Sequence, residues 1–188
     1  MATYGTVVAV DIAPDGDVRA VLEGLGSWDA AWRLDAPSGW TRLTLTSGEI
    51  DRVEQVRALL ATAGKGCAAL AEDHDEYGAL WAVLAARPGA IRTVHRRYVL
   101  NAHPKRPWQV ARALADHGTD PRADDVAGAT AAREAAEMFG VEAGPVVAAE
   151  ARADELHRNL GVVGGPFPWW DALGLVWPGP AAGTPVER

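Results

Sequence analysis

Cysteine and long apolar runs are scarce in this chain of 188 residues, and each scarcity excludes a class of protein. The single cysteine, Cys67, rules out a disulfide scaffold and cysteine-rich zinc or iron–sulfur sites, and it is typical of a reducing compartment. The longest uncharged apolar run, residues 78–86, is about half of what a membrane span needs. The N-terminus has neither the basic region nor the apolar core of a secretion signal. We therefore expect a cytoplasmic protein with no membrane segment.

The short motifs by which many enzymes are recognised are also missing. The sequence contains no Gly-x-x-x-x-Gly-Lys phosphate loop, no Gly-x-Ser-x-Gly nucleophile elbow and no His-Glu-x-x-His zinc motif. Gly24-x-Gly26 is followed by Asp29, where a dinucleotide-binding fingerprint requires glycine. These absences lower the expectation of an enzyme without eliminating it, and from them we expect no cofactor and no metal.

The apolar pattern over residues 4–72 indicates an α+β fold. Apolar residues make up 48% and charged residues 23% of the chain, as in a globular protein. Alternating and helical spacings give the order strand, helix, strand, strand, helix, strand. This order predicts a ferredoxin-like βαββαβ sandwich, in which both helices cover one face of an antiparallel sheet. Such a fold hosts many unrelated functions and therefore predicts none.

Beyond residue 72 the pattern predicts a helix–strand unit and then a helical region. The helix is expected over 75–86, with Asp73-x-x-Glu76 as its capping box, and the strand over 91–100. Further helices are expected over 108–117, 121–139 and 145–160. We expect three parts: an α+β domain over 1–101, a helical subdomain over 102–161 and an aromatic, proline-rich segment over 162–188.

The C-terminal segment has two interpretations. Three of the eight tryptophans lie between residues 169 and 177, among prolines and glycines, and no regular element is expected over 164–170. The aromatic side chains either staple the helices to the sheet or form an exposed recognition surface. We favour the staple, because a soluble chain seldom exposes so apolar a patch.

The densest group of acid–base residues is Glu72-Asp73-His74-Asp75-Glu76. Carboxylates packed this closely repel, which raises the pKa of one of them and creates a general acid; a divalent cation would relieve the same repulsion. Helix capping accounts for most of the cluster and is the interpretation we favour, but it leaves His74 unexplained. In an enzyme, His74 or His95 would be the general base and Asp73 the orienting carboxylate.

Residues 87–112 contain seven basic side chains and no acid, so the rest of the chain carries a net charge of −14. Three alternatives remain open: ion pairs with acids of the helices, an anion site, and a protein interface. The candidate binding residues of this basic segment are Arg92, Arg96, Arg97, Tyr98, His103, Arg106 and Trp108.

From these patterns we expect a non-catalytic binding protein of the adaptor, regulator or immunity type. Its arginine and aromatic face would hold an acidic or phosphorylated protein or a small anionic ligand. The alternative is a small enzyme with a His/Asp acid–base pair, Arg97 as an anion clamp and a tryptophan-lined pocket. The net charge of −7 disfavours nucleic acid as a partner, because the acidic remainder would repel a long polyanion.

Overall fold

The structure is a computed structural model that describes residues 4–64, 66–74, 77–87, 89–100, 120–164 and 166–187. Its first elements are β1 (Tyr4–Ile12), α1 (Val18–Glu23), β2 (Ala30–Asp35), β3 (Thr41–Ser47), α2 (Val53–Ala63) and β4 (Cys67–His74). The order of elements predicted for residues 4–72 is the order found. The later elements are β5 (Gly78–Arg87), β6 (Ala90–Leu100), α4 (Ala129–Phe139), α5 (Ala143–Ala151), α6 (Ala153–Gly164), α7 (Phe167–Ala172), η1 (Pro180–Ala182) and β7 (Thr184–Pro185).

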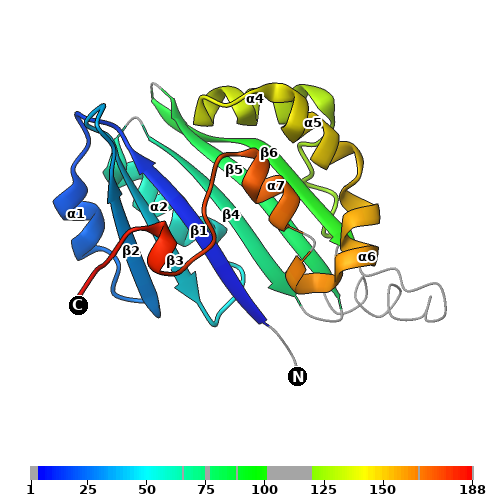
Figure 1. Cartoon of the computed structure of the whole chain (residues 1–188), viewed down its shortest axis with the longest axis horizontal. Coiled ribbons are helices and arrows are strands. Elements are labelled where there is room, and N and C mark those ends of the chain that lie inside the picture. The colour runs from blue at the N-terminus through cyan, green and yellow to red at the C-terminus, as the bar shows by residue number, and fades with distance from the viewer. Residues whose placement is uncertain are drawn as a thin grey trace.

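An antiparallel sheet of seven strands forms the centre of the molecule, in the order β6-β5-β4-β1-β3-β2-β7. Figure 1 shows α4 to α7 in front of this sheet and α2 behind it. The protein is therefore of mixed α and β structure, as expected. The sheet is larger than a simple four-stranded ferredoxin-like sandwich, because β5 and β6 extend one edge and β7 the other.

The segment predicted as a helix over 75–86 is instead the strand β5, which pairs with β4 and β6. Both of its faces are buried: Leu80 and Leu84 belong to one core, Trp81 and Val83 to the other. A strand buried on both faces loses the apolar–polar alternation that would distinguish it from a buried helix. Asp73 consequently lies within β4 and caps no helix.

Two hydrophobic cores lie on the two faces of the sheet, because successive side chains of a strand point to opposite sides. Helices α1 and α2 cover the first core, whose strand residues include Val8, Val10 and Leu70. Helices α4 to α7 cover the second core, where the strands present mainly small side chains such as Ala69 and Ala71. Within the described residues, none of the helices is sufficiently long and apolar to cross a bilayer.

The aromatic C-terminal segment packs against the second face of the sheet, which confirms the staple. Trp169 and Trp170 are fully buried, and Trp169 stacks on Trp81 and on His95 with ring centroids 5.8 and 5.5 Å apart. The prediction of no regular element was wrong here, because residues 167–172 form α7. Pro168 is tolerated since it lies in the first turn, where a backbone N–H has no helical partner.

The helix predicted over 121–139 begins only at residue 129, and the residues before it approach β6. The Asp120 carboxylate accepts hydrogen bonds from the backbone N–H and the side chain of Arg122, which turns the chain. Val126 then exchanges two backbone hydrogen bonds with Arg96, at 2.8 and 2.9 Å. The helix predicted over 145–160 is likewise two helices, α5 and α6, separated at Arg152. The turn at 120–125 thereby lies beside the end of the sheet where His74 is found.

Candidate functional site

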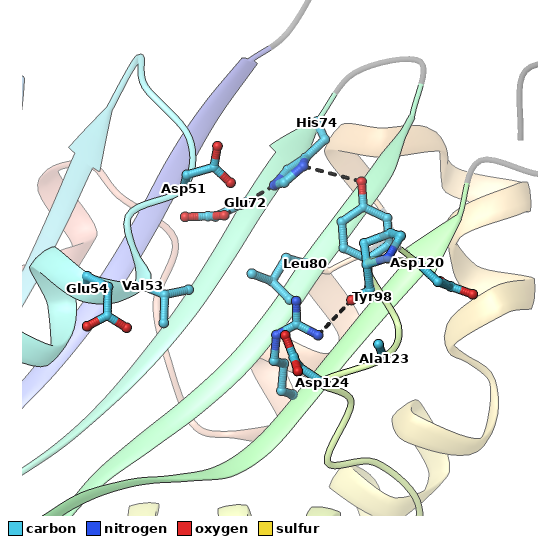
Figure 2. A pocket seen from close by; sticks show the side chains of 12 residues that line it. Asp51, Val53, Glu54, Glu72, His74, Leu80, Tyr98, Asp120, Ala123 and Asp124 are labelled. Carbon is cyan, nitrogen blue, oxygen red and sulfur yellow. Dashed lines mark hydrogen bonds and ion pairs between the residues drawn. The ribbon is translucent and has the colours of Figure 1, made fainter. Parts of the chain in front are cut away.

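A pocket of about 380 Å³ opens at this end of the sheet, on the face covered by α2. The start of α2, the end of β4, strands β5 and β6 and the turn at 120–125 surround it (Figure 2). Five carboxylates and one guanidinium are among the residues that line it: Asp51, Val53, Glu54, Glu72, His74, Leu80, Arg96, Tyr98, Asp120, Pro121, Ala123 and Asp124.

Glu72 and His74 are the buried polar residues of this pocket. They occupy alternate positions of β4 and so project from the same face of the strand. The Nε2 atom of His74 lies 3.1 Å from Oε2 of Glu72, and its Nδ1 atom lies 3.3 Å from the Tyr98 hydroxyl oxygen. The backbone N–H of Arg52 donates to Oε1 of Glu72 at 2.6 Å, which holds the carboxylate in place. The imidazole is therefore fixed between a carboxylate and a phenol (Figure 2).

Asp51 brings a second carboxylate to the same point. It belongs to the connection between β3 and α2 and has a φ of 62°, a left-handed conformation that no other described non-glycine residue adopts. Aspartate tolerates this region better than most residues, because its short side chain can bond locally. Figure 2 shows its carboxylate directed toward Glu72 and His74. The backbone turn thus places an exposed carboxylate over the buried Glu72–His74 pair.

Internal pairing neutralises only part of the charge around the pocket. Glu54 pairs with Arg57, Asp120 with Arg122, and Arg96 with Asp125. Hydrogen bonds from Arg122 hold the pKa of Asp120 at about 2, so this carboxylate is ionised at neutral pH. Within the described parts of the chain, the carboxylates of Asp51, Glu72 and Asp124 have no lysine or arginine side chain as a partner. The pocket therefore presents a net negative charge.

The structure brings three of the candidate residues together and separates the others. His74, Arg96 and Tyr98 line the pocket. Asp73 projects from the opposite face of β4, so Glu72 rather than Asp73 orients His74. Arg92 is exposed on β6. His103, Arg106 and Trp108 lie outside the described residues.

His95 and Arg97 belong to the other face of the sheet, where they bind carboxylates of the helices. His95 is fully buried, with Nε2 at 2.9 Å from Oε2 of Glu150. Arg97 donates to Oε1 of Glu150 at 3.1 Å and to Asp154 at 2.9 Å. The N–H of Gly128 donates to the same Glu150 oxygen at 2.7 Å. This cluster attaches α4, α5 and α6 to β6, which favours internal pairing for these members of the basic segment.

Glu150 makes the stability of the protein depend on pH. Burial alone would raise its pKa, but hydrogen bonds from His95 and Gly128 and the charges of His95 and Arg97 outweigh it and hold the pKa at about 2. A lowered carboxyl pKa contributes stability that is complete above the ordinary value of 4.5 and is lost as the pH falls toward 2. We expect the difference in unfolding free energy between the wild type and Glu150→Gln to shrink from pH 6 to pH 3 in urea titrations. An equal difference at both pH values would contradict this origin.

A second pocket, of about 460 Å³, lies at the opposite end of β4, and fewer ionisable side chains line it. Arg42 and Asp11 form a largely buried ion pair there, with the two atoms 2.6 Å apart. Burial, followed by the negative charge of Asp11, raises the pKa of the Cys67 thiol to about 12. A thiol that stays protonated at neutral pH is a poor nucleophile, so Cys67 is a core residue.

The tryptophans also lie away from His74. Trp81, Trp169 and Trp170 are buried in the core under α4 to α7, and none of the described tryptophans lines the pocket. Comparisons with protein-family models, with curated proteins and with solved structures gave no match to this chain. The geometry of the pocket is therefore the basis for a functional proposal.

Proposed function

We propose that the pocket beside His74 is the working site of this protein and that it binds a small, positively charged ligand. The observation that carries the proposal is the set of three carboxylates, Asp51, Glu72 and Asp124, that no described lysine or arginine side chain neutralises. A concave site lined by one sign of charge concentrates ligands of the opposite sign. The volume of about 380 Å³ is within the range of small-molecule sites.

The walls of the pocket support a ligand with an apolar body. Val53 and Leu80 contribute aliphatic surface between the acidic groups, and Tyr98 contributes an aromatic ring. An ammonium or guanidinium group is attracted both by carboxylates and by the face of an aromatic ring. This combination favours a short alkyl amine or guanidine over a bare anion.

His74 would exchange a proton with the ligand. In the neutral ring, Nε2–H donates to Glu72, because a carboxylate can only accept, and Nδ1 then accepts from the Tyr98 hydroxyl. The same chain of groups supports a second candidate function, a small enzyme with His74 as general base and Glu72 as its orienting carboxylate.

Binding of an acidic partner on the basic segment has less support. Arg92 is exposed and would be available to such a partner, whereas Arg96 and Arg97 already bind internal carboxylates. We expect Arg92→Glu to leave the recovery of any acidic partner unchanged in a pull-down. Loss of the partner in this variant would instead support binding of an acidic partner on the basic segment.

Two finer proposals concern fold and location. We infer that β1 to β4 with α1 and α2 are a ferredoxin-like unit, supported by the partial order β4-β1-β3-β2 and by both helices lying over one core. A free, buried cysteine supports a reducing compartment, so we retain the cytoplasm as the proposed location.

The binding proposal is tested by NMR titration of the full chain in buffer with EDTA. The probes are 1,4-diaminobutane, a dication, and succinate, a dianion of equal chain length. The diamine is expected to shift the ring signals of His74 and Tyr98, and succinate is not. Equal responses to both probes, or shifts confined to residues away from the pocket, would overturn the proposal.

Two variants with the same change of charge locate the binding. Asp124→Asn removes a pocket carboxylate and is expected to weaken diamine binding about fivefold, since one unit charge about 4 Å away in a water-filled pocket contributes about 1 kcal/mol. Asp171→Asn removes an exposed carboxylate of α7, on the other side of the sheet, and is expected to leave the affinity unchanged. Similar losses in the two variants would mean that the overall charge, and not the pocket, attracts the diamine.

A further inference from the structure

Three side chains from two separate segments converge at the inner end of the pocket. Asp51 comes from the turn before α2, and Glu72 and His74 come from one face of β4. One ligand atom from each lies within 4.8 Å of the other two. Glu72 and His74 are almost completely buried, and Asp51 is exposed above them.

Among the described residues, no lysine or arginine side chain pairs with either of the two carboxylates. Arg52 follows Asp51 directly, but its guanidinium binds other residues. It donates to Ser47 Oγ at 3.0 Å and to the Ser27 carbonyl at 3.2 Å, pairs with Glu49, and lies over the Trp28 ring. Two carboxylates held this close, one of them buried, repel unless a positive charge lies between them.

The spacing between the His74 and Glu72 donors matches that of two ligands on one metal ion, and a donor atom of Asp51 lies within 4.8 Å of both. Two ligands bound at about 2.1 Å lie roughly 3.0–3.4 Å apart in octahedral or tetrahedral geometry. Nε2 of His74 and Oε2 of Glu72 are 3.1 Å apart. A metal ion would replace the proton on Nε2, and the ring would then donate Nδ1–H to the Tyr98 oxygen, which lies 3.3 Å away. Tyr98 is thus placed as the outer partner that ligating histidines usually have.

We infer that Asp51, Glu72 and His74 coordinate a divalent transition-metal ion. This inference rests on the proposed function, since it names a cation for the same pocket. One imidazole and two carboxylates suit Mn²⁺, Fe²⁺ or Zn²⁺ better than Ca²⁺ or Mg²⁺, which prefer oxygen ligands alone. Three protein ligands leave coordination positions open toward the pocket, where the outer carboxylates and Tyr98 would contact a second ligand.

The experiment measures Mn²⁺ binding to the full chain through the loss of the free Mn²⁺ signal in electron paramagnetic resonance. The wild type is expected to bind one Mn²⁺ per chain, and Zn²⁺ to displace it. Asp51→Asn and His74→Gln are each expected to weaken Mn²⁺ binding at least about tenfold, since even outer partners of a metal site are worth that much. Asp124→Asn, in the same pocket but outside the ligand set, is expected to change it less than about threefold.

Asp51→Asn is the decisive variant, because Asp51 is exposed and asparagine also tolerates a positive φ. Circular dichroism melting of each variant confirms that it is folded. Unchanged Mn²⁺ affinity in Asp51→Asn would overturn the assignment. Failure of the wild type to bind Mn²⁺, while 1,4-diaminobutane still shifts His74, would overturn the metal site and leave the proposed function standing. Failure of both probes would overturn both.

Discussion

Glu150→Ala is expected to lower the free energy of unfolding by about 3–5 kcal/mol, the usual cost of removing one partner of a buried charged pair. Glu150 is almost completely buried and accepts hydrogen bonds from His95, Arg97 and the N–H of Gly128. Alanine leaves all three donors without this acceptor and detaches α5 from both β6 and the start of α4. Urea unfolding followed by tryptophan fluorescence measures the change.

Asp154→Ala is the matched control, because Asp154 binds the same guanidinium of Arg97 from an exposed position. Exposed pairs contribute little, so a loss below about 1 kcal/mol is expected. If the two variants lost the same stability, burial of the Glu150 cluster would not be the source of its contribution.

Trp169→Ala is expected to cost about 3–5 kcal/mol, the range for truncating a fully buried aromatic residue. The indole of Trp169 stacks on Trp81 and on His95, and so it joins α7 to the middle of β5 and β6. Alanine would leave a cavity that the rigid sheet cannot close. The exposed Val176, a few residues further along the same segment, provides the control, and Val176→Ala is expected to change stability by less than about 0.5 kcal/mol. A loss below 1 kcal/mol for Trp169→Ala would place the C-terminal segment outside the core.

The sequence predicted the elements whose local signals agree with their environment. Strands β1 to β4 and helices α1 and α2 combine clear periodicity with turn and cap residues such as Asp17 and Gly64. It did not predict β5, because burial on both faces removes the alternation that marks a strand. The sequence also did not predict that α4 begins as late as residue 129. The backbone bridge from Val126 to Arg96 is a tertiary contact, and no local sequence pattern indicates it.

For the candidate site, the sequence singled out His74 and paired it with Asp73, whereas the structure places Glu72 beside it. Asp73 is adjacent in sequence, yet in a strand it faces away, and Glu72 two positions earlier shares the face of His74. Had the predicted strand been extended to residue 74, the alternation of its side chains would have placed Glu72, and not Asp73, on the same face as His74. Nothing in the sequence points to Asp51, because its approach depends on a single left-handed residue between β3 and α2. The sequence likewise did not predict the role of Glu150, because its partners His95 and Arg97 lie more than fifty positions earlier, on β6.

The structure also explains the contrast between the basic segment over residues 87–112 and the acidic remainder of the chain. Strand β6 carries its arginines between two sets of acids: Arg96 binds Asp125 on one side of the sheet, and Arg97 binds Glu150 and Asp154 on the other. These pairs use the basic segment to attach the C-terminal half to the sheet. Three described acids without such partners, Asp51, Glu72 and Asp124, line the pocket beside His74, which is why we assign a cation, and not an anion, to this pocket.

The most direct measurement is the anomalous difference map of crystals of the full chain soaked in Mn²⁺. We expect the strongest peak to lie in the pocket, within bonding distance of His74 Nε2 and of the carboxylates of Asp51 and Glu72. Peaks confined to other surface carboxylates, with none beside His74 in a crystal where the pocket is open to solvent, would contradict it.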